Sequence, residues 1–116
     1  MKRIMFVCNR LGGGGAERVI TILANEFINK GYESRFCIFR GVDNAYEINH
    51  SITITQLFEE NEVVSKIQKI KRLRQEIKSY QPDVIISFEY FVNMQTIIAA
   101  YGLNSKIIIS ERNDPK

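Results

Sequence analysis

Four consecutive glycines, Gly12, Gly13, Gly14 and Gly15, follow a short apolar run at residues 4–8 and precede a helical pattern. Strand, glycine loop and helix in this order are typical of the first turn of a mononucleotide-binding βαβ unit. Glycine has no Cβ, so the backbone can turn sharply and let a ligand approach closely. The N–H groups at the start of the next helix suit an anion such as phosphate. The pattern therefore predicts an α/β fold with an anion-facing loop.

The spacing of this loop matches neither of two common nucleotide motifs. The G-x-G-x-x-G fingerprint needs a glycine where Glu17 or Arg18 stands, and the P-loop needs a Gly-Lys-Ser/Thr triplet that this chain lacks. The loop by itself is therefore a weak indication of a dinucleotide or ATP site.

Apolar runs alternate with helical patterns along the whole chain. We expect strands at residues 4–8, 34–39, 52–57, 84–88 and 106–110, and helices at residues 16–30, 59–80 and 91–101. This alternation predicts a parallel sheet with helices on both faces. Right-handed crossovers make 3-2-1-4-5 the default strand order. We therefore expect one Rossmann-like, doubly wound domain over residues 1–116.

The first two helices have recognisable apolar faces. In the first, the expected buried face consists of Val19, Ile20, Leu23, Phe27 and Ile28, and Gly31 is placed to end the helix in a left-handed cap. In the second, the expected apolar stripe consists of Val63, Ile67, Ile70, Leu73 and Ile77. Three acidic residues, Glu59, Glu60 and Glu62, are expected to open the second helix, where their charge is favourable.

The remaining faces of the second helix are basic. They carry Lys66, Lys69, Lys71, Arg72, Arg74 and Lys78. One reading is a solvated outer face, and the other is contact of helix 63–80 with anionic lipid. The net charge of +3 and the lack of interleaved aromatic residues argue against nucleic-acid binding. No apolar run is long enough to span a bilayer, and no signal-peptide pattern opens the chain. We therefore expect a cytoplasmic protein, with peripheral contact at the inner membrane face as the alternative.

The cysteines and the histidine do not indicate a catalytic or metal centre. Cys8 and Cys37 lie in strand-like apolar runs without metal-ligand spacing, so we expect buried free thiols. His50 lies in a polar segment, where a surface loop is the simplest interpretation. We expect no metal ion and no cofactor.

Polar residues gather where the expected strands end. In open parallel sheets, ligands bind outside the carboxyl ends of the strands, at the switch point beside the first strand. The site candidates at this edge are Asn9, Arg10, Glu17, Arg18, Glu89, Tyr90, Asn93, Glu111, Arg112 and Asn113. The glycine loop and Glu89-Tyr90 flank the switch point and are the best placed.

The fifth expected strand raises a question of its own. Residues 107–109 are three isoleucines, a core-type run, yet no helical pattern follows to cover them at what would be a sheet edge. We therefore expect that the natural chain continues past Lys116, and that this fragment self-associates through the exposed strand or the open cleft face.

Three stretches resemble one enzyme family. Residues 13–19, Gly-Gly-Gly-Ala-Glu-Arg-Val, resemble the G-G-A-E-R-V opening of bacterial glycosyltransferases of family 4. Residues 84–88 with Asn93 are similar to the fourth strand of these enzymes and the loop after it. Residues 108–115 are similar to the S-E-R-N-D-P run that many of them carry after the fifth strand.

This resemblance implies the amino-terminal, acceptor-binding lobe of a retaining, metal-independent enzyme with the two-lobed GT-B fold. Such an enzyme would move a sugar, of hexosyltransferase type, from a nucleotide-sugar to a glycan or lipid-linked acceptor in cell envelope polysaccharide synthesis. The glycine loop, with Glu17 and Arg18, would face the donor diphosphate. Glu111, Arg112 and Asn113 would lie near the acceptor or the transferred sugar.

The resemblance also implies what this chain lacks. The carboxy-terminal lobe, with its nucleotide pocket and E-x7-E carboxylate pair, is absent, so we expect the fragment to be inactive alone. Many relatives have a histidine after the fifth strand where this chain reads Glu-Arg-Asn, so the catalytic residues stay unassigned.

The alternative function is a non-catalytic α/β module that binds a nucleotide or phosphate. A receiver domain is disfavoured, because Asn9-Arg10 and Phe58 stand where its acidic residues would be. A dehydrogenase half is disfavoured by the failed fingerprint, and by Arg40 where an acidic residue would accept ribose hydroxyls.

Overall fold

The computed structural model describes residues 2–9, 15–39, 52–59 and 62–110, with only the backbone at residues 15–20, 90 and 110. Five strands and three helices alternate along the chain. The strands are β1 (Arg3–Cys8), β2 (Glu33–Ile38), β3 (Thr53–Gln56), β4 (Val84–Phe88) and β5 (Lys106–Ser110). The helices are α1 (Gly15–Asn29), α2 (Lys66–Tyr80) and α3 (Tyr90–Ala99).

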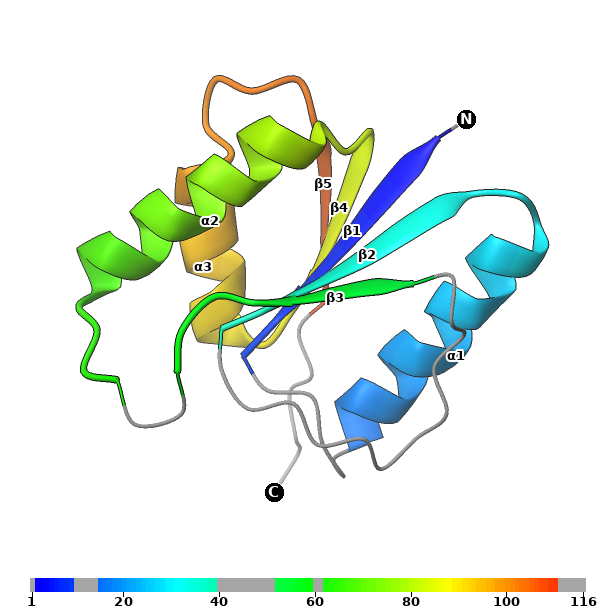
Figure 1. Cartoon of the computed structure of the whole chain (residues 1–116), viewed down its shortest axis with the longest axis horizontal. Coiled ribbons are helices and arrows are strands. Elements are labelled where there is room, and N and C mark those ends of the chain that lie inside the picture. The colour runs from blue at the N-terminus through cyan, green and yellow to red at the C-terminus, as the bar shows by residue number, and fades with distance from the viewer. Residues whose placement is uncertain (1, 10–14, 40–51, 60–61, 111–116) are drawn as a thin grey trace.

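The sheet has the order β3-β2-β1-β4-β5, and each adjacent pair is parallel. β1 lies in the centre, where Ile4 pairs with Ser34 of β2 and with Val84 of β4. Helix α1 covers one face, while α2 and α3 cover the other (Figure 1). The predicted doubly wound fold and its strand order are confirmed. Strands β4 and β5 have the predicted bounds.

Each face of the sheet has its own apolar core, because successive side chains of a strand point to opposite faces. On the α2/α3 face, Met5, Val7, Cys37, Phe39, Leu73, Ile77 and Val92 pack together. On the α1 face, Ile4, Phe6, Cys8, Ala24, Phe36 and Ile38 do so. The two cysteines are free and buried, as predicted, and they lie on opposite faces.

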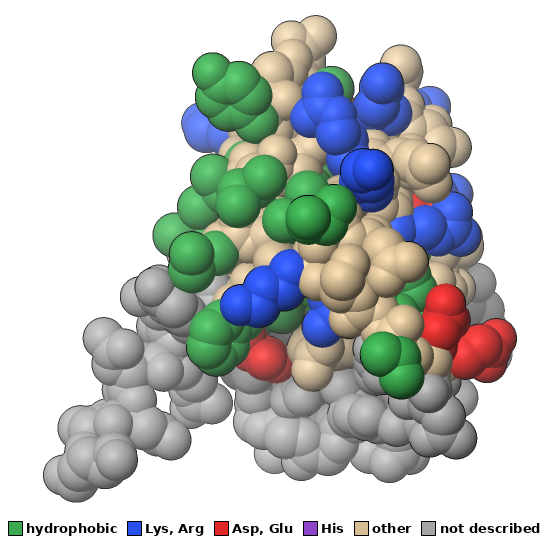
Figure 2. Space-filling view, turned by 90° about the vertical axis from the view of Figure 1, so that its left-hand side faces the viewer, with side chains coloured by type: hydrophobic (Ala, Val, Ile, Leu, Met, Phe, Trp, Pro, Cys, Tyr) green, Lys and Arg blue, Asp and Glu red, His purple; other side chains and the backbone are tan. Residues whose placement is uncertain are grey.

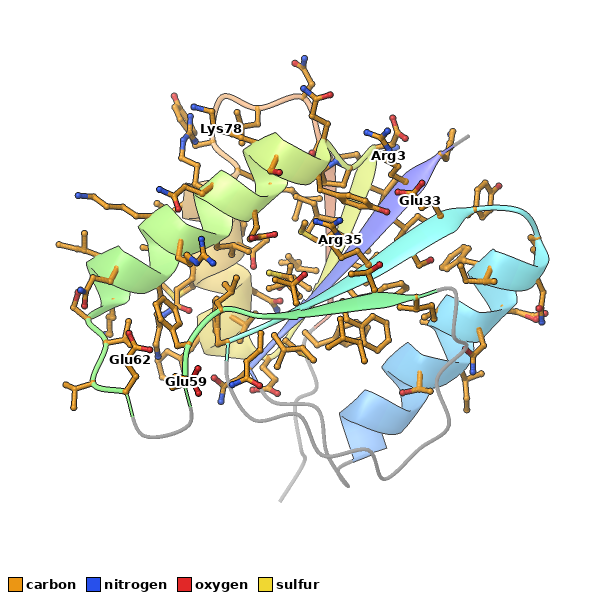
Figure 3. The ribbon with its side chains drawn as sticks, viewed as in Figure 1. Arg3, Glu33, Arg35, Glu59, Glu62 and Lys78 are labelled. Carbon is orange, nitrogen blue, oxygen red and sulfur yellow. The ribbon has the colours of Figure 1, made fainter. Side chains whose placement is uncertain are left out.

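Helix α2 begins later than the sequence pattern indicated. Ser65 is its N-cap and accepts a hydrogen bond from the N–H of Gln68 at 3.2 Å, while the Gln68 side chain accepts from the N–H of Ser65 at 2.9 Å. This capping box fixes the helix start. The prediction that the glutamates open the helix is therefore wrong: Glu59 and Glu62 lie before α2, where the Glu62 carboxylate accepts from the N–H of Glu59 (Figure 3).

The predicted apolar stripe of this helix is only half right. Leu73 and Ile77 are fully buried and Ile70 is partly buried, whereas Val63 is 96% and Ile67 is 66% exposed. Val63 lies before α2, and Ile67 in the first turn of the helix does not reach the core.

The predicted face of α1 also needs correction. Phe27 and Ile28 pack against the core as expected, but Leu23 is partly exposed, and the buried positions of that turn are Thr21 and Ala24. The side chains of Val19 and Ile20 lie outside the described residues. Gly31 has φ +90, the left-handed conformation predicted for the end of this helix.

A charged cluster joins the end of α2 to the amino ends of the central strands. Arg3 donates to the carbonyl of Tyr80 at 2.9 Å and pairs with Glu33 at 3.7 Å. Arg35 lies 4.3 Å from the centre of the Tyr80 ring and pairs with Glu76 of α2 at 3.6 Å. Figure 3 shows Arg3, Glu33 and Arg35 together at this end of the sheet. The cluster holds α2 against the sheet at the edge opposite the candidate site.

The edge strand β5 is partly exposed. Ile107 packs against the core beneath α2 and α3, whereas Ile108 and Ile109 are each about half exposed. Among the described helices, none covers the α1 face of β5.

Candidate functional site

A cavity of about 400 Å³ opens at the carboxyl edge of the sheet. Three of its lining residues directly follow strands: Asn9 follows β1, Phe39 follows β2 and Glu89 follows β4. The other lining residues are Lys66, Lys69, Phe91, Val92 and Gln95. The cavity therefore lies at the switch point beside β1, where ligands bind in open α/β sheets. Two predicted site residues, Asn9 and Glu89, line it.

Glu89 has an unusual backbone. Its φ of 79° and ψ of 141° lie in a region that residues other than glycine rarely adopt. The bend turns the chain from β4 directly into α3, and the Glu89 carbonyl accepts from the N–H of Asn93 at 2.8 Å. Such a conformation costs about 1–3 kcal/mol and is found at functional sites more often than elsewhere. The strained backbone therefore makes Glu89 the best-supported candidate for a functional residue in this site.

Asn93 is brought to the same region but faces inward. It is 2% exposed, and its amide oxygen accepts a hydrogen bond from the hydroxyl of Ser87 in β4. In the next turn, the Thr96 hydroxyl donates to the carbonyl of Val92 at 2.8 Å. Asn93 thus fastens the start of α3 to β4, which holds the strained Glu89 in place.

Two lysines form the cationic side of the cavity. Lys66 and Lys69 lie in the first turn of α2, three residues apart and thus on one side of the helix. The ammonium group of Lys69 lies 5.8 Å from the centre of the buried Phe39 ring. The last turn of α2 leads into the amino end of β4. The first turn of α2 therefore lies at the opposite, carboxyl edge of the sheet.

The sequence reasoning did not include these lysines, Phe91 or Gln95 among the site residues. A signal was present: the first turn of each helix that precedes a parallel strand lies at the binding edge. This signal was not used because the helix was predicted to begin at Glu59, which placed Lys66 beyond its first turn. The Ser65–Gln68 capping pattern would have corrected this.

Several predicted site residues lie outside the described part of the chain. They are Arg10, Gly12, Gly13, Gly14, Glu111, Arg112 and Asn113. Helix α1 begins at Gly15, and Glu17 and Arg18 lie in its first turn, but their side chains are not described. The same holds for the side chain of Tyr90, the first residue of α3. His50 also lies outside the described residues. The roles assigned to these residues stay predictions.

Burial controls the chemistry of the Cys37 thiol. Cys37 is fully buried, and this burial raises the pKa of its thiol far above the ordinary value of 9.0. A thiol held neutral is a poor nucleophile and a poor metal ligand. Within residues 2–9, 15–39, 52–59 and 62–110, no three His, Cys, Asp or Glu side chains are grouped to hold a metal ion.

The comparison with known proteins identifies the family. The model of Glycosyltransferase Family 4 matches residues 13–113, which is most of the chain. This chain belongs to Glycosyltransferase Family 4. The family resemblance drawn from the three motifs is confirmed, and the alternative of a non-catalytic nucleotide-binding module is not favoured.

One curated relative is similar to this chain in sequence, and two solved structures are similar to it in fold. The chain is 31% identical over 120 residues to the GalNAc-alpha-(1->4)-GalNAc-alpha-(1->3)-diNAcBac-PP-undecaprenol alpha-1,4-N-acetyl-D-galactosaminyltransferase of Campylobacter jejuni, with 98% of this chain and 33% of the relative covered. Sucrose-phosphate synthase from Thermosynechococcus elongatus has a similar fold, with a TM-score of 0.74, 8% identity, and coverage of 94% of this chain and 32% of that one. The lipopolysaccharide outer core galactosyltransferase WaaB gives a TM-score of 0.68, 19% identity, and coverage of 96% and 32%.

The chain therefore spans about a third of the length of this curated relative and of these two structures. Its five-stranded parallel sheet is one Rossmann-like half of a GT-B fold. None of the helices that the structure describes is long and apolar enough to cross a bilayer.

Proposed function

We propose that this chain is the amino-terminal, acceptor-side lobe of a retaining glycosyltransferase of hexosyltransferase type. The enzyme would move a sugar from a nucleotide-sugar to a glycan or lipid-linked acceptor in cell envelope polysaccharide synthesis, without a metal ion. The observation that carries the proposal is the family match over residues 13–113. The cavity at the carboxyl edge of β1, β2 and β4 supports it, because this is the edge where such a lobe binds ligands.

The relative from Campylobacter jejuni supports a lipid-linked acceptor. Its name describes transfer of N-acetylgalactosamine to a glycan carried on PP-undecaprenol. We infer the same acceptor class, a glycan joined to a lipid through a diphosphate, for the enzyme that contains this lobe.

A second lobe would supply the nucleotide pocket and the catalytic carboxylates, so the fragment alone would have no turnover. We expect isothermal titration calorimetry of this chain with UDP- and GDP-sugars to show weak binding or none. Micromolar affinity would mean that the donor site is complete without a second lobe.

The role of the cavity is tested in a longer protein that carries this lobe. Glu89→Gln should lower sugar transfer about tenfold or more, since a hydrogen bond to a charged group contributes about 1.5–3 kcal/mol. Glu33→Gln, an exposed carboxylate at the opposite edge of the sheet, serves as the matched control. Equal activity of the two variants would contradict a role for this cavity in the reaction.

We also propose that the face formed by α2 and α3 contacts the membrane peripherally at the cytoplasmic side. Figure 2 shows exposed hydrophobic side chains beside Lys and Arg side chains on this face. The apolar group consists of Phe91, Met94, Ile97 and Ile98 of α3, with Tyr101 just after the helix. Exposed cations of α2 include Lys71 and Lys78. Apolar area next to cations is the composition of surfaces that bind anionic lipid.

Vesicle co-sedimentation tests this contact. Lys71→Glu with Lys78→Glu should weaken binding to phosphatidylglycerol vesicles by about 2 kcal/mol or more, since each basic residue contributes about 1 kcal/mol near such a surface. Lys2→Glu with Lys30→Glu makes the same charge change away from α2 and should leave binding almost unchanged. Equal binding of both double variants would refute the contact.

We further propose that the isolated chain self-associates through β5. Ile108 and Ile109 are half exposed, and among the described strands β5 has a neighbour on one side only, which favours association. Multi-angle light scattering should show dimers or larger species that Ile108→Lys reduces. A monomer at high concentration would contradict the proposal.

A further inference from the structure

A second cavity, of about 470 Å³, lies at the amino edge of the sheet. Its lining residues come from the end of α2 and the turn into β4, residues 77–83, and from the loop between α3 and β5, residues 102–105. Its volume lies within the range of small-molecule sites, about 300–1,000 Å³. The five-residue strands β4 and β5 separate the two edges of the sheet by roughly 16 Å, at about 3.3 Å per residue. This cavity is therefore distinct from the candidate site at the carboxyl edge.

Hydrogen bonds join the two walls of the amino-edge cavity. The Ser105 hydroxyl donates to the carbonyl of Pro82 at 2.7 Å, and the N–H of Lys106 donates to the carbonyl of Asp83 at 2.9 Å. Asp83 is also fixed to β1, because its carboxylate accepts from the N–H of Arg3 at 2.8 Å. These bonds hold the cavity in shape before a ligand arrives, which lowers the cost of binding.

Gln81 lines this cavity in a backbone conformation that favours glycine. It ends α2 with φ 54° and ψ 57°, in the left-handed region. Within the described residues, Gln81 and Glu89 are the two non-glycine residues with positive φ, and each lines one of the two cavities. Strain of this kind is found more often at functional sites than elsewhere. Glycine would adopt this conformation at lower cost, so the strained backbone indicates a use for the Gln81 side chain.

The lining of the amino-edge cavity has balanced charge and uncharged polar groups. Lys78, in the last turn of α2, and Asp83 are its two charged side chains, so their formal charges cancel (Figure 3). The amides of Gln81 and Asn104 each offer both donors and acceptors. Within the part of the chain that the structure describes, no hydrogen bond or ion pair occupies the side chains of Lys78, Gln81 or Asn104. These groups can therefore bind a polar ligand that has no net charge.

The buried part of the same lining is apolar. Ile77 is 1% exposed, Pro82 is buried and Leu103 is partly buried. A sugar ring presents hydroxyl groups, which both donate and accept hydrogen bonds, and an apolar face of C–H groups. An ion would find no opposite net charge here, and a wholly apolar ligand would leave the amides unpaired. The lining therefore matches a neutral sugar ring better than either.

We propose that the cavity between the end of α2 and the α3–β5 loop is a binding site for an uncharged sugar residue. The amides of Gln81 and Asn104 bind its hydroxyl groups, and the apolar face of its ring packs on Ile77 and Leu103. This site goes beyond the proposed transferase function and does not depend on it. Sugar binding can be measured on this chain without any transfer reaction, so its failure would leave the transferase function standing.

Heteronuclear NMR titration of the isotope-labelled chain tests both the site and the class of ligand. The probes are methyl galactoside and N-acetylgalactosamine, with L-leucine as a zwitterion and putrescine as a diamine for comparison. Each sugar should shift the backbone amide resonances of Gly102, Leu103 and Asn104 until they saturate. Sugar-induced shifts confined to the carboxyl edge, or no shifts, would overturn the site. Saturation at the amino edge by leucine or putrescine but not by the sugars would overturn the ligand class.

Amide variants test the role of the individual side chains. Gln81→Gly with Asn104→Ala should weaken sugar binding about tenfold, since two hydrogen-bonding groups are lost. Gln75→Ala with Asn29→Ala removes two exposed amides outside the cavity and should leave the affinity almost unchanged. Equal losses of affinity in the two double variants would overturn the assignment.

The stability of Gln81→Gly separates a binding role from a structural one. This single variant should leave the midpoint of urea unfolding unchanged or raise it, because glycine adopts the left-handed conformation more easily. Its sugar affinity should fall all the same. A lowered midpoint would show that Gln81 serves the fold, and would overturn its role in binding.

Discussion

Replacing Leu73 with alanine tests which part of α2 stabilises the fold. Leu73 is fully buried in the core between α2, α3 and the sheet. Deletion of a buried leucine side chain costs about 2–5 kcal/mol, the larger values arising where the cavity cannot collapse. Leu73 packs among residues from several elements, so we expect the upper half of that range. This is a large share of the roughly 5–15 kcal/mol by which a domain is stable.

Ile67→Ala is the matched control on the same helix and the same predicted stripe. Ile67 is 66% exposed, so its truncation should change the free energy of unfolding by less than about 0.5 kcal/mol. Urea unfolding followed by circular dichroism measures both. With an m-value of about 1–3 kcal/mol/M, Leu73→Ala should lower the midpoint by about 1–5 M, while Ile67→Ala leaves it almost unchanged. Equal losses would show that the first turn of α2 packs on the core, and would refute this description of the helix.

Three further outcomes are expected. Ser65→Ala should destabilise the chain by about 0.5–2 kcal/mol in urea unfolding, whereas Ser79→Ala, an exposed serine of α2 far from the cap, should not. Ser87→Ala should cost about 1–3 kcal/mol, because the buried amide oxygen of Asn93 loses the hydrogen bond from the Ser87 hydroxyl; a Tm equal to that of the unaltered chain would argue against this hydrogen bond. Burial raises the pKa of Cys37, so the folded chain keeps a proton that the unfolded chain loses above its ordinary pKa of 9.0. Stability is therefore unaffected by this thiol below that pH and should fall above it by up to about 1.4 kcal/mol per pH unit, a slope that Cys37→Ala should lessen in urea titrations at several pH values.

The parts of the fold that could be predicted are those where local pattern and topology agree. Residues 84–88 and 106–110 are short runs rich in β-branched residues, bounded by Pro82 and Gly102, and both became strands with the predicted bounds. The strand order followed from the handedness of the crossovers, which leaves few alternatives. Gly31 ended α1 as expected because a left-handed residue is needed there.

The helix faces could not be predicted as well. The apolar periodicity of the predicted helix includes Val63 and Ile67, but Val63 lies before α2 and Ile67 is mostly exposed in its first turn. Which turns of a helix pack on the sheet is decided by tertiary packing, which no local pattern records. In α1 the small residue Ala24 is buried where Leu23 was expected, because the helix lies close to the strands on that face.

The site was predicted in outline, since strand ends at the switch point must lie together. The positions of Asn9 and Glu89 follow from that rule. The inward turn of Asn93 toward Ser87 and the positive φ of Glu89 are products of tertiary packing, so the sequence alone could not give them. The lysines were missed because the predicted helix began at Glu59, about two helical turns before the start of α2, which placed Lys66 and Lys69 away from its first turn.

The central place of β1 has a consequence for synthesis of the protein. Ile4 of β1 pairs with Val84 of β4, which is 80 positions later in the chain. β1 therefore leaves the ribosome well before β4 has been synthesised. At translation rates of about 5–20 residues per second, that interval is about 4–16 s. Throughout it, the most apolar strand of the nascent chain has one side of its backbone unpaired, which makes it a natural target for ribosome-bound chaperones.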